Sequence, residues 1–141
     1  MRLIIAVLLI VHGLIVAGQS ASSFSAASGV PNPAWLSWWP ANLGQSWLLS
    51  MLGIEQTLVA RAGGFLWLAA AVALVGAGLG VIGLGVPAAW WRGLALGGAA
   101  LSLGMLIVYL HPFYGLGIGA SAAVLAATLW SHGSVLSRLG L

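Results

Sequence analysis

The stretch AGGFLWLAAAVALVGAGLGVIGLGV, from Ala62 to Val86, decides the fold of this chain. It carries no charged side chain and exceeds the roughly 20 residues that an α-helix needs to cross the hydrocarbon core of a bilayer. Three further apolar runs have the same character: Leu3 to Gly18, Leu94 to Leu110 and Leu116 to Trp130. We therefore predict one all-α transmembrane domain, residues 1–141, an antiparallel four-helix bundle with spans at approximately 3–22, 58–84, 90–110 and 114–132.

The composition excludes several classes of protein. The chain has 141 residues, of which 62% are hydrophobic and 4% charged, too few polar groups to cover an apolar core in water. It lacks cysteine, so disulfides and thiolate metal sites are excluded. Nucleic acid is not an expected partner, because phosphate binding needs clustered cations and the basic residues are dispersed at Arg2, Arg61, Arg92 and Arg138. We expect no catalysis, metal or cofactor, since no ligand or nucleophile set is visible.

The first apolar run has two interpretations. It follows Arg2 and precedes the small residues SASSFSAAS, which is the outline of a signal peptide. Extension of the helix into the Ser/Ala stretch brings it to spanning length, and we favour a first transmembrane helix.

The arginines predict the orientation. In a four-span chain Arg2, Arg92 and Arg138 fall on one side and Arg61 on the other, and basic flanks stay in the cytoplasm. We expect a multi-pass protein of the bacterial plasma membrane with both termini cytoplasmic. The tryptophan-rich stretch and the turn HPFYG then share the outer face.

Four tryptophans lie within PAWLSWWPANLGQSW, Pro33 to Trp47. At helical spacing Trp35, Trp38 and Trp39 share a face, and Trp47 opens an apolar run that continues through Met51. We predict that residues 34–56 form an amphipathic segment at the outer membrane interface, where indole rings are favoured. The alternative is an aromatic ligand site that includes Trp38 and Trp39.

Glu55 is the only acidic residue of the chain. At about 100° per residue it projects near the centre of the apolar stripe of this segment, where a carboxylate needs a partner. We predict a contact with His111 or Arg61. In the alternative, the helix breaks near Gly53 and Glu55 faces water. A candidate ligand site on the outer face comprises Glu55, His111, Tyr114, Trp38 and Trp39.

His12 lies within the first span, where an ionisable residue is a functional candidate by default. Our favoured interpretation is a neutral histidine that hydrogen bonds within the bundle. Haem or pigment binding through His12 and proton handling are alternatives. His111 and His132 are expected at opposite boundaries, so no second imidazole matches the depth of His12 for bis-histidine ligation.

Small residues recur at four-residue spacing, which lets helix backbones approach closely in lipid. The partner helix of such a stripe belongs either to the same chain or to another. The stripes are Ala69, Ala73 and Ala77; Gly76 and Gly80; and Gly115, Gly119, Ala123 and Ala127.

The HG pair in the first span, the stretch RAGGFLWLAAAVALVGAG and the turn WWR together resemble the small four-helix bacterial membrane proteins called DoxX-like. The resemblance implies a compact four-helix bundle in the plasma membrane. Members have been associated, as membrane subunits, with quinone-linked or redox complexes. No functional residue carries over to this chain.

We expect a non-catalytic accessory or structural subunit of a larger membrane complex. Its partners would be other integral membrane subunits and lipids, and a homo-oligomer is possible. One alternative is a binder or carrier of a lipid, quinone or other hydrophobic molecule in an outer-face pocket near Glu55 and His111. A second is haem or pigment binding through His12, and a pore assembled from several copies is a third.

Overall fold

The computed structural model describes residues 1–25 and 29–130. Four long helices dominate it, and each is long and apolar enough to cross a membrane. They are α1 (Arg2–Ser25), α3 (Gln56–Ile82), α4 (Trp91–Val108) and α5 (Gly115–Trp130). The shorter elements are the helix α2 (Trp47–Met51) and the 3-10 turns η1 (Ala34–Leu36), η2 (Ala88–Trp90) and η3 (Pro112–Tyr114).

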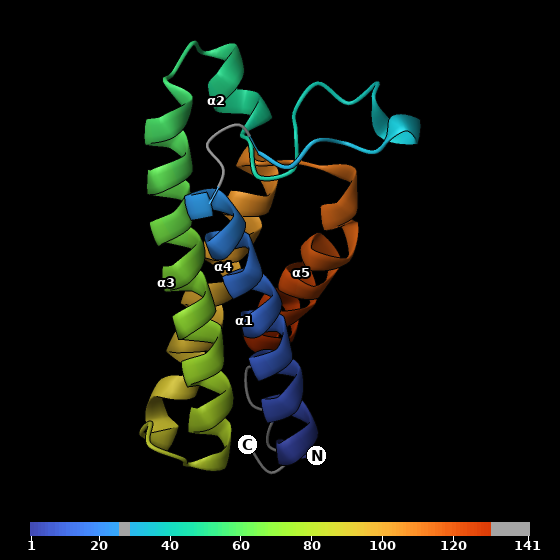
Figure 1. Ribbon diagram of the computed structural model, residues 1–141. Helices are drawn as coiled ribbons and strands as arrows, with labels where there is room; N and C mark the ends of the chain where they lie inside the picture. The colour runs from blue at the N-terminus through green and yellow to red at the C-terminus, as the bar shows by residue number, and fades with distance from the viewer. Residues whose placement is uncertain (26–28, 131–141) are drawn as a thin grey trace.

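The long helices pack antiparallel in the order α1, α3, α4, α5, which confirms the predicted fold class (Figure 1). α3 is the central helix and lies against both α1 and α4, whereas α5 packs mainly on α4. α1 and α5 are not among the closely packed helix pairs. The bundle is therefore least tightly closed between its first and last helices.

Glycines bring α1 and α3 close together. A Cβ atom added to Gly78 would lie 2.6 Å from Cγ1 of Ile10 and 2.8 Å from the backbone oxygen of Ala6. A Cβ on Gly13 would lie 3.0 Å from the backbone oxygen of Ala71. In lipid, helices gain little from the hydrophobic effect when they associate, so van der Waals packing at close backbone approaches of this kind stabilises the pair.

The predicted small-residue stripes are only partly used inside the chain. Ala77 is buried in the core, and Gly80 packs against Trp91. Ala69, by contrast, is exposed. Gly13 and Gly78, where an added Cβ would lie 3.0 Å or less from the backbone of the facing helix, were not in the predicted stripes.

The segment between α1 and α3 differs from the prediction. Residues 34–56 do not form one amphipathic element, because α2 ends at Met51 and Gly53 adopts a left-handed φ of 70°. Apart from the 3-10 turn η1 at its start, the rest of the segment is mainly loop, which an antiparallel bridge between Val30 and Leu43 ties to the chain after α1. A helical projection through Gly53 is therefore invalid.

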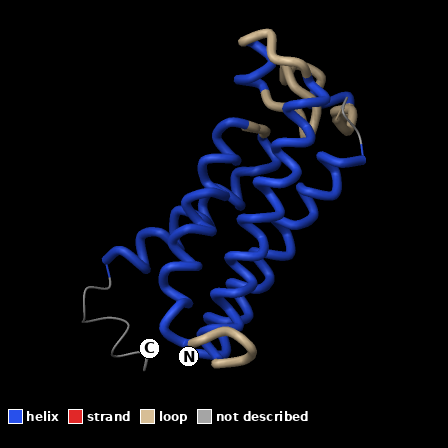
Figure 2. The backbone as a smooth tube through the Cα atoms, turned by 90° about the vertical axis from the view of Figure 1, so that its left-hand side faces the viewer, coloured by secondary structure: helices blue, strands red, loops and turns tan. Residues whose placement is uncertain are grey.

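The non-helical segments lie at the two ends of the bundle (Figure 2). The start of α1 at Arg2, the turn containing η2 and the start of α4, which includes Arg92, lie at one end. The tryptophan-rich segment and η3 lie at the other. This arrangement agrees with the predicted grouping of Arg2 and Arg92, while Arg138 and His132 lie outside the described residues. α1 packs along α3 as a full member of the bundle. Which end faces the cytoplasm stays a prediction.

Candidate functional site

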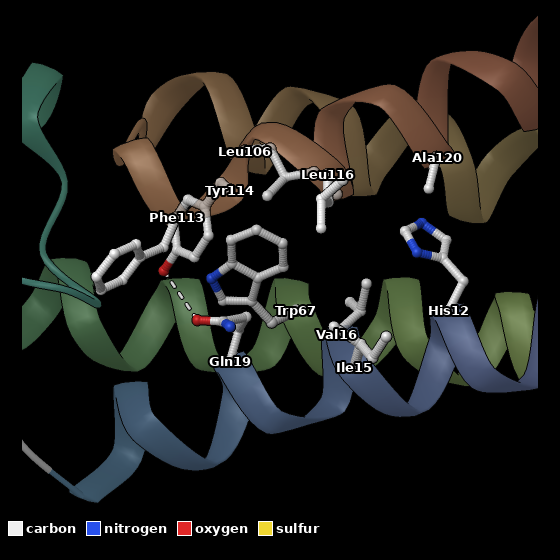
Figure 3. A pocket seen from close by; sticks show the side chains of 11 residues that line it. His12, Ile15, Val16, Gln19, Trp67, Leu106, Phe113, Tyr114, Leu116 and Ala120 are labelled. Carbon is white, nitrogen blue, oxygen red and sulfur yellow. Dashed lines mark hydrogen bonds between the residues drawn. The ribbon is translucent and has the colours of Figure 1, made fainter.

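A cavity of about 310 Å³ lies where α1 and α5 fail to pack closely (Figure 3). Its floor is Trp67 of α3, which is 1% exposed, and its rim includes Ile15 and Leu116, which are 59% and 91% exposed. The mouth therefore opens between α1 and α5, on the side of the bundle that faces lipid in a membrane. The lining residues are His12, Ile15, Val16, Gln19, Trp67, Leu106, Phe113, Tyr114, Leu116, Gly117 and Ala120.

A hydrogen bond closes the outer end of the cavity. The hydroxyl of Tyr114 donates to Oε1 of Gln19 at 2.8 Å, which ties η3 to α1 (Figure 3). The indole of Trp67 packs against the rings of Tyr114 and Tyr109 with centroid separations of 6.2 and 6.1 Å. Tyr109 in turn donates to the backbone oxygen of Val59 at 2.6 Å. Aromatic rings and hydroxyls therefore fix the position of Trp67.

A second set of polar contacts lies at the inner end. Nε2 of His12 is 3.0 Å from Oγ of Ser121, and Ser121 donates to Oγ of Ser102 at 3.1 Å. With the hydroxyl proton of Ser121 directed at Ser102, the matching tautomer of His12 carries its proton on Nε2 and donates it to Ser121. His12 is thus hydrogen-bonded within the bundle and links α1 to α5 and, through Ser121, to α4.

The predicted outer-face residues do not form one pocket. His111, Trp39 and Tyr114 come together, with the His111 ring 6.4 Å from Trp39 and 5.8 Å from Tyr114 between centroids. Trp38 touches Trp39 edge-on but is 68% exposed. Of the five predicted residues, only Tyr114 lines the cavity.

His111 is held in one tautomer. It is 1% exposed, its Nδ1 accepts the backbone N–H of Phe113 at 3.3 Å, and its Nε2 lies 2.9 Å from Oδ1 of Asn32. The amide of Asn32 donates to the backbone oxygen of Ala41 at 3.0 Å, which leaves Oδ1 as the acceptor for His111. Nε2 therefore carries the proton, and burial lowers the pKa of His111 below its usual value.

Two of the four clustered tryptophans bind the end of α4. Nε1 of Trp47 donates to the backbone oxygen of Ile107 at 2.9 Å, and Nε1 of Trp39 donates to that of Leu110 at 3.3 Å. Ser46 donates to the oxygen of Val108 at 2.8 Å. The last carbonyls of a helix have no partner within it, so these side chains act as its C-terminal cap.

The other two clustered tryptophans face outward. Trp35 and Trp38 are 66% and 68% exposed, which suits interfacial anchors. Trp39 and Trp47 therefore bind the end of α4, whereas Trp35 and Trp38 are exposed as interfacial anchors would be. Helical spacing grouped Trp39 with the two exposed tryptophans. Local spacing could not reveal its hydrogen bond to Leu110, because that acceptor lies 71 residues away in the chain.

The predicted contact between Glu55 and His111 is wrong. Glu55 is the N-cap of α3, and its carboxylate accepts the backbone N–H groups of Thr57 and Leu58 at 2.8 and 2.9 Å. The hydrogen bonds to Thr57 and then Leu58 lower the pKa of Glu55, and the charge of Arg61 is the weakest contribution. The alternative interpretation was correct, because the helix breaks at Gly53 and Glu55 is exposed.

Sequence reasoning missed Trp67, Gln19, Ser102, Ser121 and Asn32. A detectable signal existed for some of them, since a tryptophan far from either end of an apolar stretch and hydroxyls within spans are candidates for internal contacts. Asn32 offered no such signal within its loop. Among residues 1–25 and 29–130, no group of three or more His, Cys, Asp or Glu side chains gathers to hold a metal ion.

The four apolar helices define a small multi-pass membrane protein. Comparison of the chain with protein families, with curated proteins and with solved structures finds no match.

Proposed function

We propose that this protein is a non-catalytic subunit that associates with another integral membrane protein through α5. The observation that carries the proposal is the exposure of the whole α5 stripe. All four of its members face away from the bundle: Gly115, Gly119, Ala123 and Ala127.

The contrast with the α1–α3 contact supports this surface as a helix-binding face. Gly13 and Gly78 are each covered by a neighbouring helix, whereas a Cβ added to Gly115 or Gly119 would meet nothing within 4 Å. The most apolar window of the α5 span is 17% buried, against 44% for α3. A smooth surface of small residues gains packing energy in lipid when a second helix lies against it.

Further support comes from the resemblance to DoxX-like proteins, which have been associated with larger complexes as membrane subunits. We include membership of that group in the proposal, together with a bacterial plasma membrane location and cytoplasmic termini. Arg2 and Arg92 at the same end of the bundle are the basis for that orientation.

The test is affinity purification from native membranes in gentle detergent, with quantitative mass spectrometry. Three tagged forms are compared: wild type, Gly119→Leu on the stripe, and Ala69→Leu at an exposed position on α3. We expect wild type and Ala69→Leu to retain other integral subunits stoichiometrically and Gly119→Leu to lose them. Recovery of the chain alone, or only with differently tagged copies of itself, would overturn the proposal.

A further inference from the structure

Trp67 presents an unused hydrogen-bond donor to the cavity between α1 and α5. The side chain is 1% exposed, yet its indole N–H makes no hydrogen bond with residues 1–25 and 29–130. Figure 3 shows the indole nitrogen on the edge of the ring that faces Gln19 and Tyr114. Trp67 lines the cavity and this nitrogen is not fully enclosed by the described residues, so a ligand in the cavity can reach it. A buried donor of this kind favours a ligand that brings an acceptor.

A second donor lies beside it. The carboxamide oxygen of Gln19 accepts from the hydroxyl of Tyr114, so the NH₂ group of Gln19 is directed away from that hydroxyl. Apart from these groups and His12, the wall is apolar, and no charged side chain contributes to it. The site therefore suits a hydrophobic molecule that carries an uncharged oxygen acceptor at one end.

We infer that the cavity holds the carbonyl-proximal part of one acyl chain of a membrane glycerolipid, with the ester carbonyl of that chain accepting the indole N–H of Trp67. The chain would run along Val16 and Leu106 toward Ala120. Trp67 and Gln19 both contact Tyr114 of η3, just before α5 begins, so a carbonyl bound there would lie near the outer boundary of the α5 span.

The dimensions of the cavity favour a chain over a large ring system. Its volume of about 310 Å³ is at the lower end of the range for small-ligand pockets. From His12 to Gln19 the wall follows α1 for roughly 10 Å at the helical rise of about 1.5 Å per residue. A narrow, elongated space with a lateral mouth is accessible to lipid directly from the bilayer.

This site differs from the predicted pocket near Glu55 and His111, since neither residue lines the cavity. It is also independent of the proposed helix-binding face. Gly117 and Ala120 of α5 line the cavity, whereas a Cβ added to Gly119 would meet nothing within 4 Å. One helix therefore offers variants that affect either surface alone.

The experiment uses the full chain in vesicles of phosphatidylethanolamine and phosphatidylglycerol that contain a phosphatidylcholine with a photoreactive acyl chain. After irradiation, peptide mass spectrometry locates the lipid adducts. We expect wild type and the matched control Gly119→Leu to be labelled chiefly at Val16 and Leu106. Gly117→Leu, which fills the cavity, should lose most of this labelling, and Ala120→Leu is a second filling variant in case Gly117→Leu fails to fold.

A second measurement tests the carbonyl contact through Trp67→Phe, which keeps an aromatic ring but removes the N–H. Loss of one neutral hydrogen bond should reduce competitive lipid retention about fivefold. Unchanged retention would overturn this contact. Labelling spread evenly over lipid-facing positions such as Val72, or unaffected by both filling variants, would overturn the site. Displacement of the label by a quinone but not by excess phospholipid would overturn the lipid as the occupant.

Discussion

His111 organises the outer end of the bundle because each ring nitrogen has a fixed partner. Nδ1 accepts from the backbone of Phe113, and Nε2 donates to Asn32, which itself holds the loop through Ala41. A second proton can enter only at Nδ1, where it would break the bond to Phe113. One imidazole therefore couples the loop after α1 to the turn before α5.

This arrangement predicts acid sensitivity. The pKa of His111 is lowered from 6.5 by burial, so the unfolded chain binds the proton more readily than the folded chain. The contribution of His111 to the free energy of unfolding is present above pH 6.5 and is lost as the pH falls from 6.5 through the lower folded pKa. Thermal unfolding from about pH 8 to about pH 5 should show a steeper fall in Tm for wild type than for His111→Gln. Parallel Tm profiles would contradict this assignment.

The end of α4 shows how one element depends on a distant segment. The carbonyls of Ile107 and Val108, the last two of α4, accept from Trp47 and Ser46, and that of Leu110 just beyond the helix accepts from Trp39. The tryptophan-rich segment thereby covers the helix terminus, and α4 supplies the fixed frame on which that segment folds. Neither α4 nor the segment has this arrangement without the other.

Trp47→Phe should therefore lower the free energy of unfolding by about 1 kcal/mol, since one hydrogen bond to Ile107 is lost while most of the aromatic surface stays. The matched control is Trp35→Phe at an exposed position, where we expect little change. Chemical unfolding measures both variants, and amide exchange at the end of α4 should accelerate only in Trp47→Phe. Equal effects of the two substitutions would argue against the capping contact.

The contact between α1 and α3 gives a second prediction at the element scale. Gly78→Ala would place a methyl group 2.8 Å from the backbone oxygen of Ala6, and backbone cannot yield as a side chain can. We expect a destabilisation of about 1–3 kcal/mol, which is typical of overpacking. The control Gly104→Ala lies where a Cβ meets nothing within 4 Å and should be neutral or stabilising. If both variants unfold at the same temperature, the helices are not held at this close distance.

At the scale of the whole molecule, three helices meet through a buried chain of hydrogen bonds. His12 of α1 donates to Ser121 of α5, which donates to Ser102 of α4. Because α1 and α5 pack loosely, this chain and the bond between Tyr114 and Gln19 are important links across the open side of the bundle. The same loose packing leaves the cavity.

Ser121→Ala should destabilise the protein by about 1–3 kcal/mol, because it leaves the Nε2–H of His12 buried without an acceptor. Ser102→Ala removes one bond and should cost less. In the double variant the two losses should not add, since Ser121→Ala has already broken the bond to Ser102. Free energies of unfolding for this double-mutant cycle in one detergent provide the check. Strict additivity would show that the three side chains do not act together.

The sequence by itself determined the class of protein and the number of spans. Length and hydropathy are local properties, and an uncharged apolar run as long as Ala62 to Val86 is expected to form a membrane-spanning helix. The grouping of Arg2 and Arg92 at one end also follows from counting spans. None of these inferences requires knowing how the helices rotate against each other.

Only the tertiary structure decided which polar groups meet. Glu55 was misassigned because a helical projection was carried across Gly53, whose left-handed φ of 70° redirects the chain. Trp39 and Trp67 were given no internal contacts, because the residues that they contact, such as Leu110 and Tyr114, lie far away in the sequence. In a span that is apolar on every face, periodicity does not mark the buried side. The rotation and depth of each helix are set by contacts such as Gly78 against α1, so the cavity and its donors emerge only when all four helices are in place.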